Sequence, residues 1–303
     1  NHTPAGKNEE GIIGYGSGVM DHSFDYWYAG HKHLGFYPKE NKRHTIFANA
    51  KANTQIEIME EGVGNFFTPN RAFQEGYNFL DSRPEDKPFA LLLNFNVPHG
   101  AGTRSMQLRD GDLPLYRTAY RDRVEEIKLP STYVAEKDMV TSKIPKSVYS
   151  GEYIEQYNYV KTPDDMIERT IRTMQTITGI DKLLGKLLKK LEEQGVADNT
   201  IIVFTSDHGL LHGEHGLGGK VLLYEPSIRI PLIVYDPRVN IAVTRKELVA
   251  LLDIAPTLLE LTGLPVPREV QGKSLKPLIQ GIDAKWRDGL FFDNNIMIKL
   301  FPD

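Results

Sequence analysis

The stretch Ile201-Ile202-Val203-Phe204-Thr205-Ser206-Asp207-His208-Gly209 decides the fold class of this chain. A β-rich apolar run ends there in an acid, an imidazole and a glycine. Because ligands of open α/β sheets bind just outside the carboxyl ends of strands, Asp207 and His208 are expected at such an edge. Lys220 follows in a glycine-rich loop and is placed to reach back over the same pocket. The stretch therefore predicts half of a metal-assisted ester-hydrolysis site.

The segments around this stretch alternate between strand-like and helix-like patterns. The expected strands are 89–96, 201–204 and 231–235, and the expected helices are 71–80, 162–194 and 253–262. Short apolar runs without alternation are typical of strands buried on both faces of a parallel sheet. The pattern predicts an α/β fold with a mostly parallel central sheet flanked by helices.

The helix over 162–194 has the clearest signals. Thr162 is expected to cap its start, Pro163 suits the first turn, and Gly195 ends it. Apolar residues recur along it at steps of three and four, which predicts one buried face. These residues are Ile167, Ile171, Met174, Ile177, Ile180, Leu184, Leu187 and Leu191.

The composition excludes several classes of function. The 303 residues are 40% hydrophobic and 25% charged, as in an ordinary globular protein. A net charge of −4 gives no reason to expect nucleic acid as a partner. No apolar run approaches the roughly 18 residues of a membrane-spanning helix. Cysteine is absent, so thiolate ligands are excluded, and the nine histidines favour a metal site of oxygen and nitrogen ligands.

A further histidine, His99, follows the expected strand 89–96. It could donate a proton to a leaving oxygen, and it is expected near Asp207 because strand ends converge on one crevice. Lys220 could bind an oxyanion as a mobile charge. Simpler interpretations stay open, with Asp207 as a helix cap and the other two as solvated loop residues.

His212 and His215 lie four and seven residues after His208, a spacing that would place all three on one helical face. The glycines at 209, 213, 216, 218 and 219 argue against a helix in this loop. A zinc site built from these histidines is therefore the weaker interpretation.

Taken together, these segments resemble the sulfatase family of the alkaline-phosphatase-like superfamily. The matching segments are 95–99, 197–209, 213–216, Lys220, 224–225, 227–234, 252–259, 263–265 and 271–275. The likeness covers roughly residues 87–100 and 160–290 and is weaker before them. As a set these motifs are specific, whereas Asp-His-Gly alone would not be.

The resemblance implies a sulfatase that hydrolyses a sulfate monoester with one divalent cation, usually Ca²⁺. It implies that Asp207 and His208 are metal ligands and that His99 and Lys220 are catalytic residues at the sulfate or its leaving oxygen. Further substrate-binding residues under this resemblance are Lys7, His212 and His215. A sulfated small molecule or saccharide would be the substrate, in a periplasmic, extracellular or lysosomal protein.

The chain departs from the family pattern at the nucleophile. That group is a Cys or Ser in a Cys/Ser-x-Pro-Ser/Ala-Arg motif, oxidised to formylglycine, and this chain has no cysteine. Its nearest match, residues 3–7, lacks the required residues, and the family's paired N-terminal aspartates are missing. We therefore expect an N-terminally truncated catalytic domain over 1–280, the start of a C-terminal subdomain over 281–303, and no activity from this chain alone.

Two alternatives remain open from the sequence. One is a phosphoryl hydrolase or transferase of the same superfamily, and the other is a non-catalytic pseudo-enzyme. Within 100–160, aromatic and arginine residues would suit an anionic saccharide: Tyr116, Arg117, Tyr120, Arg121 and Arg123.

Overall fold

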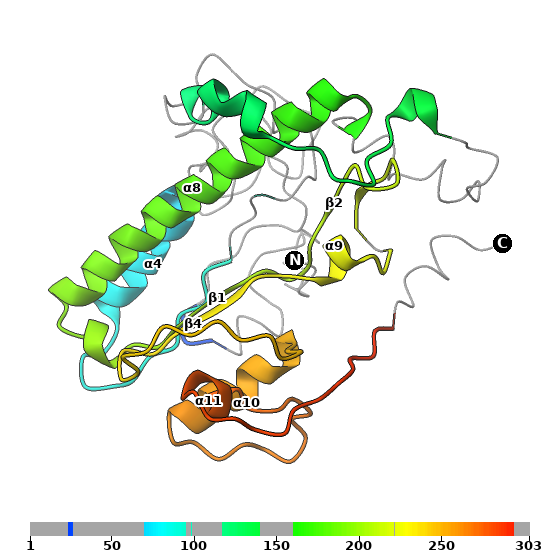
Figure 1. The fold of residues 1–303 in the computed structure, drawn as a ribbon. Coiled ribbons are helices and arrows are strands. Elements are labelled where there is room, and N and C mark those ends of the chain that lie inside the picture. The colour runs from blue at the N-terminus through cyan, green and yellow to red at the C-terminus, as the bar shows by residue number, and fades with distance from the viewer. Residues whose placement is uncertain are drawn as a thin grey trace, which may run out of the picture. The chain divides into compact units, whose positions relative to one another are not determined.

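A computed structural model of the chain describes residues 24–26, 70–94, 98, 117–139, 160–220 and 222–293 (Figure 1). The chain divides into two compact units. The first comprises Asn1–Lys190 and Leu210–Gly219, and the second comprises Leu191–Gly209 and Lys220–Asp303. No helix among the described residues is both long enough and apolar enough to cross a membrane.

The longest element is helix α8, Pro163–Glu193, which confirms the helix expected over 162–194. The Thr162 hydroxyl accepts the backbone N–H of Asp165 at 3.2 Å and donates to its carboxylate at 2.6 Å. This satisfies one of the free N–H groups at the helix start. Gly195 follows the helix with a φ of +68°, the left-handed conformation that glycine adopts without strain.

The buried face of α8 is more polar than its sequence pattern predicted. Ile171, Ile180, Leu187 and Leu191 are buried as expected, whereas Ile177 is 50% exposed. The polar residues buried on α8 are Arg169, Arg172, Gln175 and Thr176.

The reason lies in the segment around Ala119 and Tyr120, which packs on α8. The Arg172 guanidinium donates to the Gln175 side chain at 2.9 Å, and that amide donates to the backbone oxygen of Ala119 at 2.9 Å. The Tyr120 hydroxyl and the Thr178 hydroxyl lie 2.6 Å apart. Because these polar groups have partners, they can be buried where periodicity alone would predict apolar residues.

The two isoleucines of α8 permit a matched test of this buried face. Ile171→Val is expected to lower the free energy of unfolding by about 1 kcal/mol, because it removes one methylene from a packed site. Ile177→Val is expected to change it by less than about 0.5 kcal/mol, since that side chain is half exposed. Urea denaturation of the two variants checks the difference, and equal effects would contradict the observed orientation of the helix.

Helix α4, Asn70–Ser82, lies along α8 (Figure 1), and Lys190 pairs with Asp81 at 2.5 Å. Helix α4 contains the helix expected over 71–80, which confirms that prediction. The strand expected over 89–96 is wrong for its described part, because residues 89–94 form no strand. The run instead follows α4, with the Phe89 ring 6.2 Å from that of Phe79.

The first unit also contains a small hairpin and two 3₁₀ turns. Strands β2, Leu211–His212, and β3, Gly218–Gly219, pair antiparallel. The 3₁₀ turns are η2, Arg121–Glu126, and η3, Glu136–Asp138.

In the second unit, strand β1, Ile202–Thr205, pairs with β4, Leu232–Tyr235 (Figure 1). The pairing is antiparallel, so the described strands do not confirm a parallel central sheet. A parallel pair needs a crossover, usually a long helix, whereas the α-helix that the described residues form between these strands is the short α9, Glu225–Ile228. The strand at 231–235 is also not buried on both faces, because Ile233 is 60% exposed.

The rest of the second unit packs around helix α10, Ile254–Leu261. The turn η7, Leu251–Asp253, leads into it, so the helix expected over 253–262 is present. Helix α11, Lys276–Ile279, lies beside α10 (Figure 1), and the turn η6, Ala197–Asn199, precedes β1.

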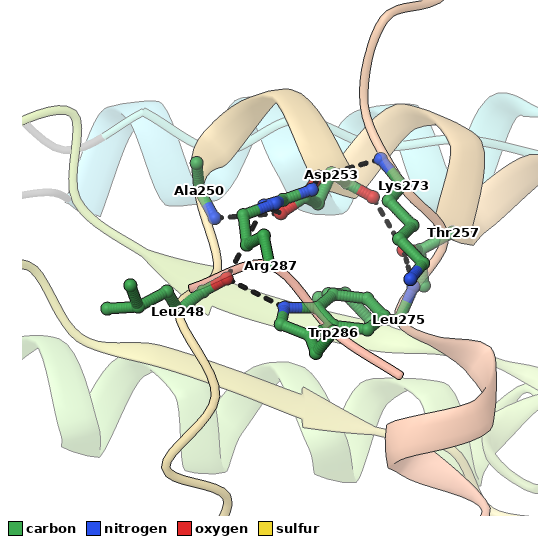
Figure 2. A network of polar contacts seen from close by, with 8 residues as sticks. All are labelled: Leu248, Ala250, Asp253, Thr257, Lys273, Leu275, Trp286 and Arg287. Carbon is green, nitrogen blue, oxygen red and sulfur yellow. Dashed lines mark hydrogen bonds and ion pairs between the residues drawn. The ribbon is translucent and has the colours of Figure 1, made fainter. Parts of the chain in front are cut away.

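A buried carboxylate, Asp253, connects these elements (Figure 2). It accepts the backbone N–H groups of Ala250 at 2.9 Å and Lys273 at 2.7 Å. Both guanidinium ends of Arg287 donate to it, at 2.5 and 2.7 Å. The indole of Trp286 donates to the backbone oxygen of Leu248 at 2.7 Å, which fastens the same segment a second time.

Candidate active site

The turn after β1 holds the acid and the imidazole in a fixed backbone shape. The Ser206 hydroxyl donates to the backbone oxygen of His208 at 2.8 Å, and the His208 N–H donates to the Asp207 carboxylate at 3.1 Å. The Gly209 N–H donates to the backbone oxygen of Ser227 at 2.8 Å. The turn is therefore tied both to itself and to α9.

Glycine is required at position 209 for a steric reason. A Cβ atom there would overlap with the backbone oxygen of Pro226 and lie 3.2 Å from that of Arg229. Sequence reasoning noted the glycine but not this close approach, which depends on the path of a segment seventeen residues later.

Lys220 reaches the same turn, as the sequence predicted. Its ammonium nitrogen lies 2.8 Å from Nε2 of His208. Nδ1 of that ring lies 2.9 Å from the backbone oxygen of Gly209. Because a carbonyl oxygen only accepts, the contact at Nδ1 assigns a proton to that nitrogen, and Nε2 is then the acceptor for the Lys220 ammonium group.

The three side chains form a partly buried polar cluster with both signs of charge. The Asp207 carboxylate lies 3.4 Å from Nε2 of His208. Burial lowers the pKa of Lys220 from its ordinary value, and the attraction of the Asp207 carboxylate offsets only part of that effect. The Lys220 amine therefore lies beside an imidazole and a carboxylate. In such a cluster, the ammonium form of the lysine can bind an anion, and the carboxylate can bind a cation that accompanies it.

The residues present fit only part of a calcium site. Asp207 is 44% exposed at its side chain and offers the oxygen ligand that Ca²⁺ prefers. His208 does not fit in this arrangement, because Lys220 occupies its Nε2 and its Nδ1 faces Gly209. Across the described residues, no three His, Asp or Glu side chains gather as metal ligands. Further ligands would have to come from elsewhere.

The other predicted histidines lie in the β2–β3 hairpin of the first unit. Burial lowers the pKa of His212 to about 3, with a smaller contribution from the charge of Arg169. His212 therefore stays neutral at physiological pH. His215 has a φ of +56°, and its N–H donates to the backbone oxygen of Thr132 at 2.7 Å. Their roles as substrate contacts stay predictions.

Two predicted site residues, His99 and Lys7, lie outside the described residues. Only Asp207, His208 and Lys220 are therefore seen together in the structure.

Two of the arginines that are candidates for saccharide binding form intramolecular ion pairs, and their role in binding stays a prediction. Arg121 donates through both ends of its guanidinium to Glu168 at 2.8 Å. Arg123 pairs with Glu126, three residues along the chain. These carboxylates lie 47 and three residues away in sequence, and only the nearer one could have been recognised from spacing.

Comparison with known proteins identifies the family. The sequence profile of the sulfatase family, named Sulfatase, matches residues 2–264. The chain therefore belongs to the sulfatase family.

Three curated relatives show the same similarity. An N-acetylglucosamine-6-O-sulfatase of Bacteroides thetaiotaomicron is 27% identical, over 78% of this chain and 50% of that protein. An arylsulfatase of Clostridium perfringens is 30% identical, over 74% of this chain and 44% of that protein. An N-acetylglucosamine-6-sulfatase of Bos taurus is 26% identical, over 95% of this chain and 48% of that protein. The chain spans about half the length of these relatives.

Solved structures show a related fold. A phosphonate monoester hydrolase from Silicibacter pomeroyi matches with a TM-score of 0.58 and 24% identity, over 71% of this chain and 42% of that one. A 2-O GAG sulfatase matches with a TM-score of 0.52 and 22% identity, over 72% of this chain and 46% of that one. These likenesses are consistent with an alkaline-phosphatase-like α/β fold.

Proposed function

We propose that this chain is part of a sulfuric ester hydrolase that cleaves a sulfate monoester with the assistance of a divalent cation. The observation that carries the proposal is the contact between Lys220 and Nε2 of His208 at 2.8 Å, directly beside the Asp207 carboxylate. Three residues singled out from the sequence thus meet at the end of one strand. Membership of the sulfatase family supports sulfate as the transferred group.

Each residue has a distinct role in this proposal. Lys220 places positive charge beside the oxygens of the bound sulfate, where negative charge increases as the ester bond breaks. Asp207 offers a carboxylate ligand to the cation, for which the family resemblance implies Ca²⁺. His99 would protonate the departing alcohol oxygen. A bound cation would neutralise sulfate oxygens and fix their orientation.

In this proposal, His208 holds Lys220 in place until a substrate anion binds. Its Nδ1 proton is directed to the Gly209 oxygen, so the ring presents a lone pair to the ammonium group. Metal ligation by His208 would require Lys220 to leave this lone pair. We propose that the approach of a sulfate anion draws Lys220 away, because an anion binds an ammonium more strongly than a neutral ring does.

The attacking group is not supplied by these residues. The chain has no cysteine, and none of its serines lies in a Cys/Ser-x-Pro-Ser/Ala-Arg motif from which formylglycine could be made. The 303 residues alone are therefore expected to show no turnover of an aryl sulfate. The polypeptide encoded by the whole gene is the appropriate protein for assays, and a Cys/Ser-x-Pro-Ser/Ala-Arg motif on the N-terminal side of Asn1 would support the proposal.

The substrate class proposed is a sulfated saccharide or a sulfated small molecule. Relatives of this chain from Bacteroides thetaiotaomicron and Bos taurus are named N-acetylglucosamine-6-sulfatases, and another is named an arylsulfatase. A periplasmic, extracellular or lysosomal location belongs to the same proposal.

The decisive experiment compares sulfate and phosphate monoesters of one alcohol with the full gene product. Sulfate ester hydrolysis is expected to be the faster reaction, and Lys220→Ala is expected to lower its kcat/KM by about 10²-fold to 10³-fold because it removes a charge that stabilises the transition state. Lys246→Ala is the matched control, since that lysine is an exposed residue outside the cluster. Faster phosphate ester hydrolysis, or full activity of Lys220→Ala, would overturn the proposal.

A further inference from the structure

Residues 130–139, here called the strap, run along the β2–β3 hairpin within the first unit. Tyr133 forms an antiparallel bridge with Glu214. The Val134 N–H donates to the oxygen of Gly213 at 3.3 Å, and the His215 N–H donates to the oxygen of Thr132 at 2.7 Å. The tip of the hairpin is therefore paired with the strap as a third strand would be.

The ring of Tyr133 fills the space that a side chain at position 213 would need. A Cβ at Gly213 would lie within 2.7 Å of Cε2 of that ring, and Gly213 has a φ of +91°. The tyrosine hydroxyl donates to the backbone oxygen of Val160 at 3.0 Å. The ring is thus fixed at its far end, just before α8, and lies against the hairpin along its edge.

The strap is anchored on both sides of this contact. The Glu136 N–H donates to the oxygen of Lys161 at 2.9 Å, and their side chains form an ion pair at 3.2 Å. On the hairpin, Met139 packs against Gly216, where its Sδ atom lies 2.8 Å from the position of an added Cβ. The hairpin tip therefore has little freedom to move while Tyr133 stays in place.

The register of the β2–β3 hairpin determines which residues lie side by side at its open end. Its register pairs Leu211 with Gly219, so the residues before and after these partners must emerge side by side. Lys220 is the next residue after Gly219, and Gly209 precedes Leu211 by two residues. A closed hairpin thus favours the approach of Lys220 to the turn that contains His208.

We propose that Tyr133 is a positioning residue of the sulfatase site, which holds the β2–β3 hairpin closed and thereby keeps Lys220 beside His208. Its consequence for catalysis rests on the proposed function. The tyrosine does not touch the Asp207, His208 and Lys220 cluster in this proposal, and acts only through the hairpin.

The test uses the 303-residue chain and two readouts. Hydrogen exchange of the amides in 211–219 reports on closure of the hairpin, and the acylation rate of the Lys220 amine, measured by mass spectrometry, reports on its contact with His208. Tyr133→Ala is expected to raise hairpin exchange at least about tenfold and Lys220 acylation about threefold, while exchange in α10 stays unchanged.

Conservative and matched variants separate positioning from a general loss of stability. Tyr133→Phe keeps the ring and is expected to restore both readouts to within about twofold of the original chain, since it loses only one hydrogen bond. Arg123→Ala changes an exposed residue of the 3₁₀ turn η2 and should alter neither readout. Gly213→Ala should raise hydrogen exchange of the hairpin in the original chain. In the Tyr133→Ala background it should raise this exchange less, because the ring with which the added methyl group would overlap is gone.

The outcomes distinguish the inference from the proposed function. The inference would be overturned if the hydrogen-exchange rates of the hairpin in Tyr133→Ala stayed within about twofold of those of the original chain. It would also be overturned if these rates rose while the acylation rate of Lys220 stayed unchanged. Neither readout involves sulfate, so both remain valid if the gene product hydrolyses no sulfate ester. If it does, Tyr133→Ala should lower kcat/KM about tenfold and Tyr133→Phe should retain it.

Discussion

Replacing Asp253 by Asn is expected to lower the free energy of unfolding of the second unit by about 4 kcal/mol, because it breaks a buried ion pair from one side. The carboxylate accepts four hydrogen bonds, two from Arg287 and two from backbone N–H groups (Figure 2). An amide at this position has one oxygen, so its NH₂ group would face donors, and the arginine would lose its counter-charge.

Urea denaturation followed by Trp286 fluorescence measures this effect, with Trp27 replaced by Phe so that a single indole reports. Trp286 is suitable because its indole is hydrogen-bonded within the same network. Glu126→Gln is the control, since the pair of Arg123 and Glu126 is more than half exposed and such solvent-screened pairs add little to stability. A loss below about 1 kcal/mol in Asp253→Asn would contradict the proposed importance of the buried pair.

The effect of Asp253→Asn should also depend on pH. Burial tends to raise the pKa of Asp253, but the hydrogen bonds from Arg287 and from the N–H groups of Lys273 and Ala250 outweigh burial and hold it below its ordinary value. A depressed pKa stabilises the folded state above the pKa of the unfolded chain, about 3.9, and this contribution is lost as pH falls through the folded value. The difference between the original and the variant should therefore be constant near neutral pH and shrink below about pH 4.

Replacing Gly209 by Ala is expected to lower the free energy of unfolding by about 3 kcal/mol and to displace the turn that carries the candidate site. The added methyl group would overlap with the backbone oxygen of Pro226, and relief requires the chain around α9 to move away. That movement would break the hydrogen bond from the Gly209 N–H to Ser227 at 2.8 Å.

Nuclear magnetic resonance of the 303-residue chain can follow this change at the site itself. The amide of residue 209 should lose its protection from exchange, and the His208 ring signals should shift as its contact with Lys220 is lost. Gly185→Ala is the matched control, because a Cβ there meets no atom within 4 Å in the middle of α8. It is expected to stabilise the helix by up to about 1 kcal/mol. Unchanged protection of residue 209 in Gly209→Ala would contradict the steric argument.

Local sequence signals determined the helices α4, α8 and α10, whereas α9 and α11 were not predicted. Thr162, Pro163 and Gly195 gave the bounds of α8 because capping and helix termination depend on residues close in sequence. The same holds for α10, which Gly263 follows with a φ of +76°. Motif spacing likewise predicted that Asp207, His208 and Lys220 lie together. The 2.8 Å contact between Lys220 and His208 joins residues only twelve positions apart in sequence.

Only the tertiary structure decided which faces are buried and which partners polar groups find. Arg172 and Gln175 are buried because Ala119, more than fifty residues away, offers a backbone acceptor, and no periodicity reveals that. The antiparallel register of β1 and β4 depends on how the chain between them returns, which composition does not encode. The closeness of the Tyr133 ring to Gly213 and of Pro226 to Gly209 is likewise visible only in the folded chain. Capping and motif spacing act between neighbours in sequence, whereas packing and register are set by distant segments that meet only in the folded chain.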